Sequence, residues 1–191
     1  MQKRLLLDGC SFTYGVGLNR VETLEHLFIE IGYSVVNLSR PGKSNQAIAL
    51  DIYNNAKDFD IIVSGWTFSS RWHLKYHKHH IDLLASRQNI ELPHVMDASE
   101  IEKSYQDLHH SLYSMFDITH WNQVSDMLVD TSNSYLNTLS KKNVFFSWEP
   151  RLTSCPVYFP HVIKIDRLAD GHLNATGTKK LFDNLINLIE Q

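Results

Sequence analysis

Leu5-Leu6-Leu7-Asp8-Gly9-Cys10-Ser11-Phe12-Thr13-Tyr14-Gly15-Val16-Gly17, close to the start of the chain, decides the fold. The three leucines form a short apolar run of the kind that becomes a buried strand, and small and polar residues take over at Gly9. Parallel sheets carry their chemistry just beyond the carboxyl ends of such strands, because the strand holds an exposed loop in place. Ser11 therefore stands where a nucleophile would stand.

Strands and helices alternate along the first third of the chain. The hydrophobic spacing predicts a strand over 3–8, a helix over 21–31, a strand over 33–38, a helix over 45–56 and a strand over 59–65. Gly32 is placed to end the first of these helices, and Ser44 is a good N-cap for the second. This order predicts a parallel α/β sheet with right-handed crossovers.

The middle of the chain has a different pattern. We find no strand between residues 66 and 142, and predict two helices, over 101–115 and 121–139, that cover one face of the sheet. A strand over 143–148, a short fifth strand over 161–165 and a closing amphipathic helix follow. The prediction is one domain over residues 1–191, a three-layer α/β/α fold with a mostly parallel, about five-stranded sheet and a helical insertion at about 68–141.

Composition narrows the functional classes. The formal net charge is −3, so the chain lacks the excess of positive charge that is typical of proteins that bind nucleic acids. Two cysteines are too few for a disulfide framework or a cysteine-based zinc site, and we expect no cofactor. No apolar run approaches the ~20 residues of a membrane span, and the N-terminus lacks signal-peptide anatomy. We therefore expect a cytoplasmic protein with no membrane partner.

Two blocks at opposite ends of the chain carry a resemblance. Gly9-Cys10-Ser11-Phe12-Thr13-Tyr14-Gly15 resembles the first block of the SGNH (GDSL-type) hydrolases, with Cys10 in place of the usual Asp. Asp170-Gly171-His172-Leu173-Asn174-x-x-Gly177 is similar to their last block, although the commoner spacing is Asp-x-x-His. The resemblance implies the flavodoxin-like fold of that family, a serine nucleophile and a catalytic triad.

A serine hydroxyl is a poor nucleophile until a base takes its proton. The resemblance implies that Ser11 is the nucleophile, His172 the base and Asp170 the group that orients the imidazole. Two alternatives stay open for the base. His172 is otherwise a loop residue beside an Asp170-Gly171 turn, and His120 is a second candidate, although Thr119 before it is well placed to cap a helix.

Acyl transfer also needs donors for the oxyanion. The resemblance implies the backbone amides of Ser11 and Gly42, together with an Asn side chain after the third strand. That Asn is missing: Gly65-Trp66-Thr67-Phe68 stands in its place, so Thr67 or Asn45 is the substitute donor. The alternative for Thr67 is a strand-end hydroxyl that satisfies its own backbone.

Three further features have a functional and an ordinary interpretation. Arg71 could clamp a substrate carboxylate or phosphate, or be a surface arginine. Cys10 could be a nucleophile, but a small residue at a strand end is more often buried and inert. The histidine-rich segment over 73–80 could bind a metal through His73 and His77 or touch an anionic substrate; we predict a solvated helical face and no metal site.

The prediction for function is a serine esterase that cleaves an O-acetyl or short acyl ester, carried by a small molecule or a carbohydrate. Two alternative functions remain, because Cys10 and Thr67 depart from the family's motifs and because hydrolysis and acyl transfer use the same catalytic residues. One is a catalytically weak binding module with the same fold. The other is an acyltransferase, which the same residues would support if the pocket excluded water.

Overall fold

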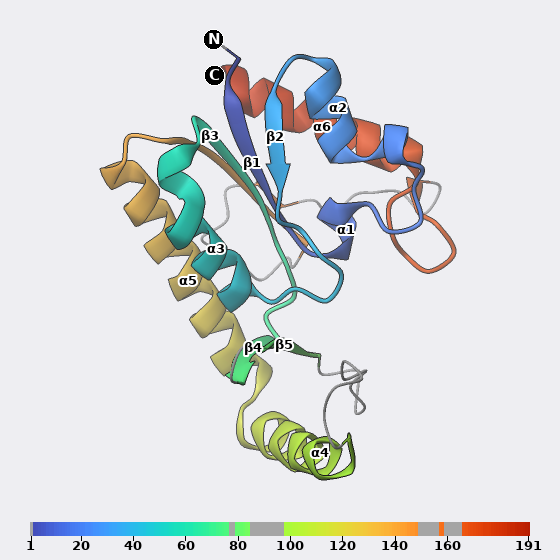
Figure 1. The fold of residues 1–191 in the computed structure, drawn as a ribbon, viewed down its shortest axis with the longest axis vertical. Helices are drawn as coiled ribbons and strands as arrows, with labels where there is room; N and C mark the ends of the chain where they lie inside the picture. Colours follow the sequence, from blue (N-terminus) through green and yellow to red (C-terminus); the bar gives the residue numbers. More distant parts are fainter. Residues whose placement is uncertain (1, 77–78, 85–97, 149–156, 159–165) are drawn as a thin grey trace.

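The structure, a computed structural model, describes residues 2–76, 79–84, 98–148, 157–158 and 166–191. Its centre is a parallel sheet of five strands in the order β2-β1-β3-β6-β7 (Figure 1). These are β1 (Arg4–Gly9), β2 (Ser34–Asn37), β3 (Ile61–Trp66), β6 (Lys142–Ser147) and β7 (Val157–Tyr158). The predicted α/β class and parallel sheet are confirmed.

The sheet is covered on both faces because its strands send apolar side chains alternately to each side. Leu5 and Leu7 pack into one apolar cluster, and Leu6 between them packs into the other. The helices that cover the two faces are α2 (Leu24–Glu30) with α6 (Ala175–Glu190), and α3 (Asn45–Asn55) with α5 (Ile118–Thr138) (Figure 1). Three layers result, as predicted.

Side-chain caps decide where the helices begin. The Ser44 hydroxyl accepts a hydrogen bond from the backbone N–H of Ala47 at 3.3 Å, so α3 starts where the sequence predicts. The helix predicted over 21–31 is instead divided at Thr23 into η1 (Arg20–Glu22) and α2. Thr23 is the N-cap of α2, and its extended backbone interrupts the helical path.

The prediction that residues 66–142 hold no strand is wrong. β4 (Arg71–Tyr76) and β5 (His79–Leu84) form an antiparallel hairpin that pairs His73 with Asp82. The histidine-rich segment is therefore not a helical face, and His77 itself lies outside the described residues. The sequence of β4 is Arg-Trp-His-Leu-Lys-Tyr, in which polar and apolar residues alternate with the period of two that strands require.

The two helices predicted in the middle exist, but only one covers the sheet. α5 packs against α3 and the sheet, whereas α4 (Ala98–Met115) lies beyond the hairpin, away from the sheet (Figure 1). The N-cap of α5 is Asp117, whose side chain accepts from the His120 N–H at 2.9 Å, and not the predicted Thr119. Within the described residues, no helix is both long and apolar enough to cross a bilayer.

The strand predicted over 161–165 is not tested by the structure. The described edge strand is β7, which pairs with the end of β6, while residues 161–165 lie outside the described residues. Two short helices follow longer elements: α1 (Ser11–Tyr14) comes directly after β1, and η2 (Ala56–Asp58) directly after α3.

Candidate active site

The ends of β1 and β3 carry glycines, Gly9 and Gly65, where the turn that holds Ser11 packs against the sheet. Thr13, on α1, is fully buried against these two strand ends. A Cβ atom on Gly9 would lie 2.2 Å from Thr13 Oγ1, and one on Gly65 would lie 2.4 Å from it. Because both positions carry only hydrogen, the turn sits directly on the sheet and holds Ser11 at its carboxyl edge.

Ser11 is the first residue of α1, and 7% of its surface is exposed. The first N–H groups of a helix have no partner within the helix. Accordingly, the Ser11 N–H makes no hydrogen bond to any described residue, and it remains available to an anionic oxygen. Cys10, directly before it, is a fully buried free cysteine, which fits the inert interpretation.

A tight turn over 166–174 presents His172. Its ends are joined by the Asn174 N–H donating to Asp166 O at 2.9 Å, and its middle by the Leu168 N–H donating to His172 O at 2.7 Å. Gly171 sits at the bend with φ +88°, a conformation that favours glycine. The backbone around His172 is thus fixed by several hydrogen bonds before α6 begins.

Asp170 lies against the imidazole of His172. Its Oδ2 is 3.0 Å from His172 Nδ1, and its Oδ1 accepts the His172 backbone N–H at 3.1 Å. The backbone N–H of His172 lowers the pKa of Asp170, and the imidazole lowers it further. The contact meets an ion-pair distance but not hydrogen-bond geometry, since Nδ1 has no hydrogen-bond partner among the described residues. A carboxylate this close to Nδ1 still favours the tautomer with its proton there, which leaves Nε2 as the nitrogen able to accept a proton.

Phe12 connects the two loops. Its ring stacks on Trp148 with centroids 4.8 Å apart and lies 4.8 Å from the His172 ring. His172, near the end of the chain, therefore packs on the residue that follows Ser11. No hydrogen bond joins them among the described residues, and such contacts are often loose without substrate.

The loop after β2 reaches the same strand end. The Arg40 N–H donates to Gly9 O at 3.2 Å, which holds this loop beside the residues that precede Ser11. Gly42 follows with φ +78°, and its N–H has no hydrogen-bond acceptor in the described part of the chain. The second amide implied by the family resemblance therefore lies on a loop tied to β1 and binds no acceptor among the residues that the structure describes.

A buried charge cluster, which the sequence analysis missed, anchors this loop. The ammonium group of Lys43 is fully buried, pairs with Asp8 and Asp51, and donates to Leu38 O at 3.0 Å. Asp8 is itself fully buried at the end of β1. The signal was present in the sequence, because a carboxylate directly after an apolar strand run needs a partner when it is buried.

Burial raises the pKa of Asp8 to about 6, and the Lys43 ammonium opposes that rise. Asp51 raises it further, because like charges disfavour ionisation. Asp8 Oδ2 has no hydrogen-bond partner among the described residues, so part of its desolvation is uncompensated. The cluster is thus a strong link between β1 and the Gly42 loop, held at an electrostatic cost.

Asn45 and Thr67, the two substitute donors predicted for the oxyanion, hydrogen-bond to each other. Asn45 Oδ1 accepts the Thr67 N–H at 2.8 Å, while Asn45 Nδ2 donates to Thr67 O at 3.1 Å and to Ser125 Oγ at 3.0 Å. Both amide hydrogens of Asn45 are therefore used, which corrects the prediction that it donates to an oxyanion. The Thr67 hydroxyl is buried and has no partner among the described residues.

The remaining candidates lie in two places. Arg71 is at the start of β4, where its Nη1 donates to Lys43 O at 3.5 Å and its guanidinium lies 5.1 Å from the Phe68 ring centroid. His120 is on α5 and stacks on Phe116 at 4.4 Å. Its ring contacts are with Phe116 and Trp121 at the α4–α5 junction, so it does not share the Phe12 contact that brings His172 to Ser11.

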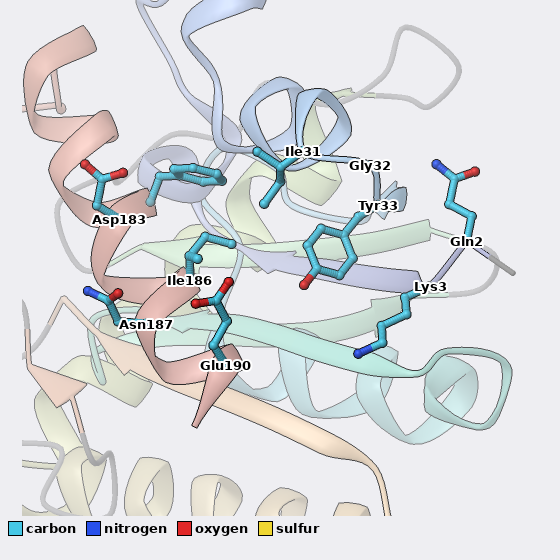
Figure 2. A pocket seen from close by; sticks show the side chains of 10 residues that line it. Gln2, Lys3, Ile31, Gly32, Tyr33, Asp183, Ile186, Asn187 and Glu190 are labelled. Carbon is cyan, nitrogen blue, oxygen red and sulfur yellow. The ribbon is translucent and has the colours of Figure 1, made fainter.

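A hollow of about 690 Å³ occupies the other end of the sheet (Figure 2). It lies where β1 and β2 start and α6 ends, opposite to the edge that carries Ser11. Its lining is Gln2, Lys3, Ile31, Gly32, Tyr33, Phe182, Asp183, Ile186, Asn187 and Glu190. None of the predicted catalytic residues belongs to it.

Comparison with known proteins places this arrangement in a structural group. No protein-family model and no curated protein matches the sequence. Among solved structures, TesA matches with a TM-score of 0.56 and 13% identity, over 98% of each chain. The psychrotrophic esterase EstA from Pseudoalteromonas sp., inhibited by monoethylphosphonate, matches with a TM-score of 0.54 and 11% identity, over 99% of this chain and 97% of EstA.

The chain has the SGNH-hydrolase fold. In this fold the first block follows β1 and the last block precedes α6, as the resemblance of both ends implied. At such low identity the likeness concerns the fold, and the same fold can carry different activities. The activity of this SGNH-fold chain is therefore argued from its own residues.

Proposed function

We propose that the protein is a serine esterase that cleaves a carboxylic ester with an acetyl or short acyl group. Ser11 Oγ attacks the carbonyl carbon while His172 Nε2 takes the hydroxyl proton. The C–O bond to the alcohol then breaks, and the imidazolium returns that proton to the leaving oxygen. Water repeats the sequence on the acyl-serine and regenerates the enzyme. Asp170 holds the imidazole in the required tautomer and stabilises its protonated form.

The oxyanion is held by backbone amides in this proposal. The N–H groups of Ser11 and Gly42 have no acceptor among the described residues, and both lie on loops attached to the end of β1. Preorganised N–H groups of this kind stabilise charge as it develops, and the loss of one donor typically costs ~10²–10³ in rate. The Thr67 hydroxyl, which lacks a partner, is the third candidate donor.

The observation that carries the proposal is the packing of the Asp170–His172 turn on the residue after Ser11. The Asp170 carboxylate contacts the His172 imidazole, and that imidazole packs on Phe12, the residue next to Ser11. The resemblance of the two sequence blocks and the fold shared with an esterase add support.

The test is hydrolysis of p-nitrophenyl acetate by the wild type and by Ser11→Ala. We expect kcat to fall by at least 10³-fold in Ser11→Ala, because no other group supplies the nucleophile. Ser34→Ala, on the exposed start of β2, is the matched control and should keep wild-type kcat. Equal rates in the wild type and Ser11→Ala would remove Ser11 from the mechanism.

One observation favours a second function, a weakly catalytic binding module. The third oxyanion position has no free side-chain amide, since Asn45 uses both hydrogens internally and Thr67 is fully buried. A fluorophosphonate probe separates the two functions. Labelling that depends on Ser11 supports the esterase, whereas absence of labelling in a protein that still binds a sugar ester supports the binding module.

A further inference from the structure

Two arginines lie over the two rings of an aromatic pair that includes Phe12, the residue after Ser11. Phe12 and Phe68 meet edge to face with their ring centroids 6.4 Å apart. The guanidinium carbon of Arg167 lies 6.0 Å from the Phe12 centroid, and that of Arg71 lies 5.1 Å from the Phe68 centroid. Two positive charges thus border one aromatic pair at the edge of the sheet that carries Ser11.

Each of these arginines is also held by a loop of the proposed active site. Arg71 donates to the carbonyl of Lys43, directly after Gly42. Arg167 Nη1 donates at 2.8 Å to the carbonyl of Gly171, between Asp170 and His172. One bond and one ring face fix each guanidinium, while most of its five N–H donors remain for another acceptor.

The charge of the two arginines is not neutralised within the described part of the chain. Lys43 pairs with two carboxylates, Lys179 with Asp183 and Lys180 with Asp166, but neither arginine forms an ion pair with a described residue. Both side chains are half-buried, so solvent screens them only in part. A fixed, unpaired guanidinium is the group that binds carboxylates and phosphates in bidentate geometry.

We propose that the ester substrate carries a negatively charged group, a carboxylate or phosphate, that Arg71 and Arg167 bind while its carbonyl lies against Ser11. This rests on the proposed esterase function and names its substrate class. The two arginines then decide specificity: the charge is bound outside the reacting bond, and a neutral ester of the same shape lacks that interaction. The anion lies on the alcohol or the acyl side of the ester.

The experiment compares esters that differ by one charge. 4-Acetoxybenzoate and its methyl ester place the charge on the alcohol side, and mono-(4-nitrophenyl) adipate and its methyl ester place it on the acyl side. We expect kcat/KM for the anionic member of one pair to exceed that of the neutral member by about tenfold or more. That ratio should fall about tenfold in Arg71→Gln and in Arg167→Gln, chiefly through KM.

The matched control is Arg4→Gln. Arg4 carries the same charge and lies over an aromatic ring, 4.9 Å from the Phe59 centroid, but at the opposite end of β1. It should leave the anionic-to-neutral ratio unchanged. Arg71→Lys tests the fork geometry: it retains the charge and should recover only part of the ratio, a pattern that a folding defect does not produce.

A binding measurement keeps this inference separate from the proposed function. Calorimetry with Ser11→Ala compares the anionic with the neutral ester in each of the two pairs, without any chemical step. Preferential binding of the anion that is lost in Ser11→Ala/Arg71→Gln supports the inference even if no ester is hydrolysed. Equal affinities, or a turnover ratio near one for both pairs in a Ser11-dependent enzyme, would overturn it while leaving the esterase proposal intact.

Discussion

Lys43→Met tests the buried link between β1 and the Gly42 loop. The substitution keeps an unbranched side chain that is one atom shorter, and it removes the ammonium that pairs with Asp8 and Asp51. Breaking a buried ion pair by removing one partner typically costs about 3–5 kcal/mol, because it leaves an uncompensated buried charge. Asp8 is fully buried, whereas 29% of the Asp51 side chain is exposed, so most of the cost arises at Asp8.

The loss of stability should depend on pH. Burial raises the pKa of Asp8 to about 6 in the wild type, against the lowering effects of Lys43 and the Gly9 N–H and with the raising effect of Asp51. Without the ammonium this pKa rises further. A carboxyl with a raised pKa in the folded state contributes stability that is present below its unfolded pKa and lost as pH rises through the folded pKa. The destabilisation of Lys43→Met should therefore be larger at pH 8 than at pH 5.

Urea unfolding followed by tryptophan fluorescence measures this change, and thermal unfolding gives a second reading. At ~2–4 °C per kcal/mol for a chain of this size, the expected fall in Tm is about 6–20 °C. Lys179→Met, which removes a surface pair with Asp183, is the control and should change stability by less than about 1 kcal/mol. Asp8→Asn/Lys43→Met should recover part of the loss. A cost below about 1 kcal/mol at pH 8 for Lys43→Met would refute the reasoning.

Three further changes test other parts of the site. Gly65→Ala should destabilise the fold by about 1–3 kcal/mol, because its Cβ would lie 2.4 Å from Thr13 Oγ1; denaturant titration measures this, and an unchanged midpoint would contradict the seating of α1. Ser44→Ala should cost about 0.5–2 kcal/mol through loss of the α3 cap, because the hydroxyl is fully buried and water does not replace it; denaturant titration measures this, and an unchanged midpoint would contradict the role of the cap. Asp170→Asn should lower kcat for p-nitrophenyl acetate by about 10²-fold while KM stays within a factor of about three, since His172 loses its orienting carboxylate; an unchanged kcat would remove Asp170 from the mechanism.

Local signals in the sequence were enough to predict most of the regular structure. The strand before Gly9, the cap at Ser44 and the closing helix after Asn174 all depend on residues close together in the chain. The β4–β5 hairpin was not predicted, because the spacing of four between His73 and His77 also fits a helix. The alternation of apolar and polar residues in the same segment is the signal that indicates the strand.

The roles of the polar residues were less accessible, since they depend on partners far apart in the sequence. Asn45 had the right chemistry for an oxyanion donor, but Thr67 and Ser125 take its hydrogens. Lys43 pairs both with Asp51, eight positions away, and with Asp8, 35 positions away, and only the fold brings Asp8 to it. Hydrogen-bond satisfaction is a property of the packed site, so residue type alone does not assign it.

The sequence by itself determined the α/β class, the place of Ser11 after the first strand and the two blocks that resemble SGNH hydrolases. These follow from hydrophobic period and from short motifs, which neighbouring residues encode. The tertiary structure alone shows that His172 packs on Phe12 and that Lys43 joins β1 to the Gly42 loop. It also places at the same edge two arginines that form no ion pair with a described residue. The parallel crossovers bring the ends of distant strands together, and the burial of charge there selects which polar groups pair and which remain available to a substrate.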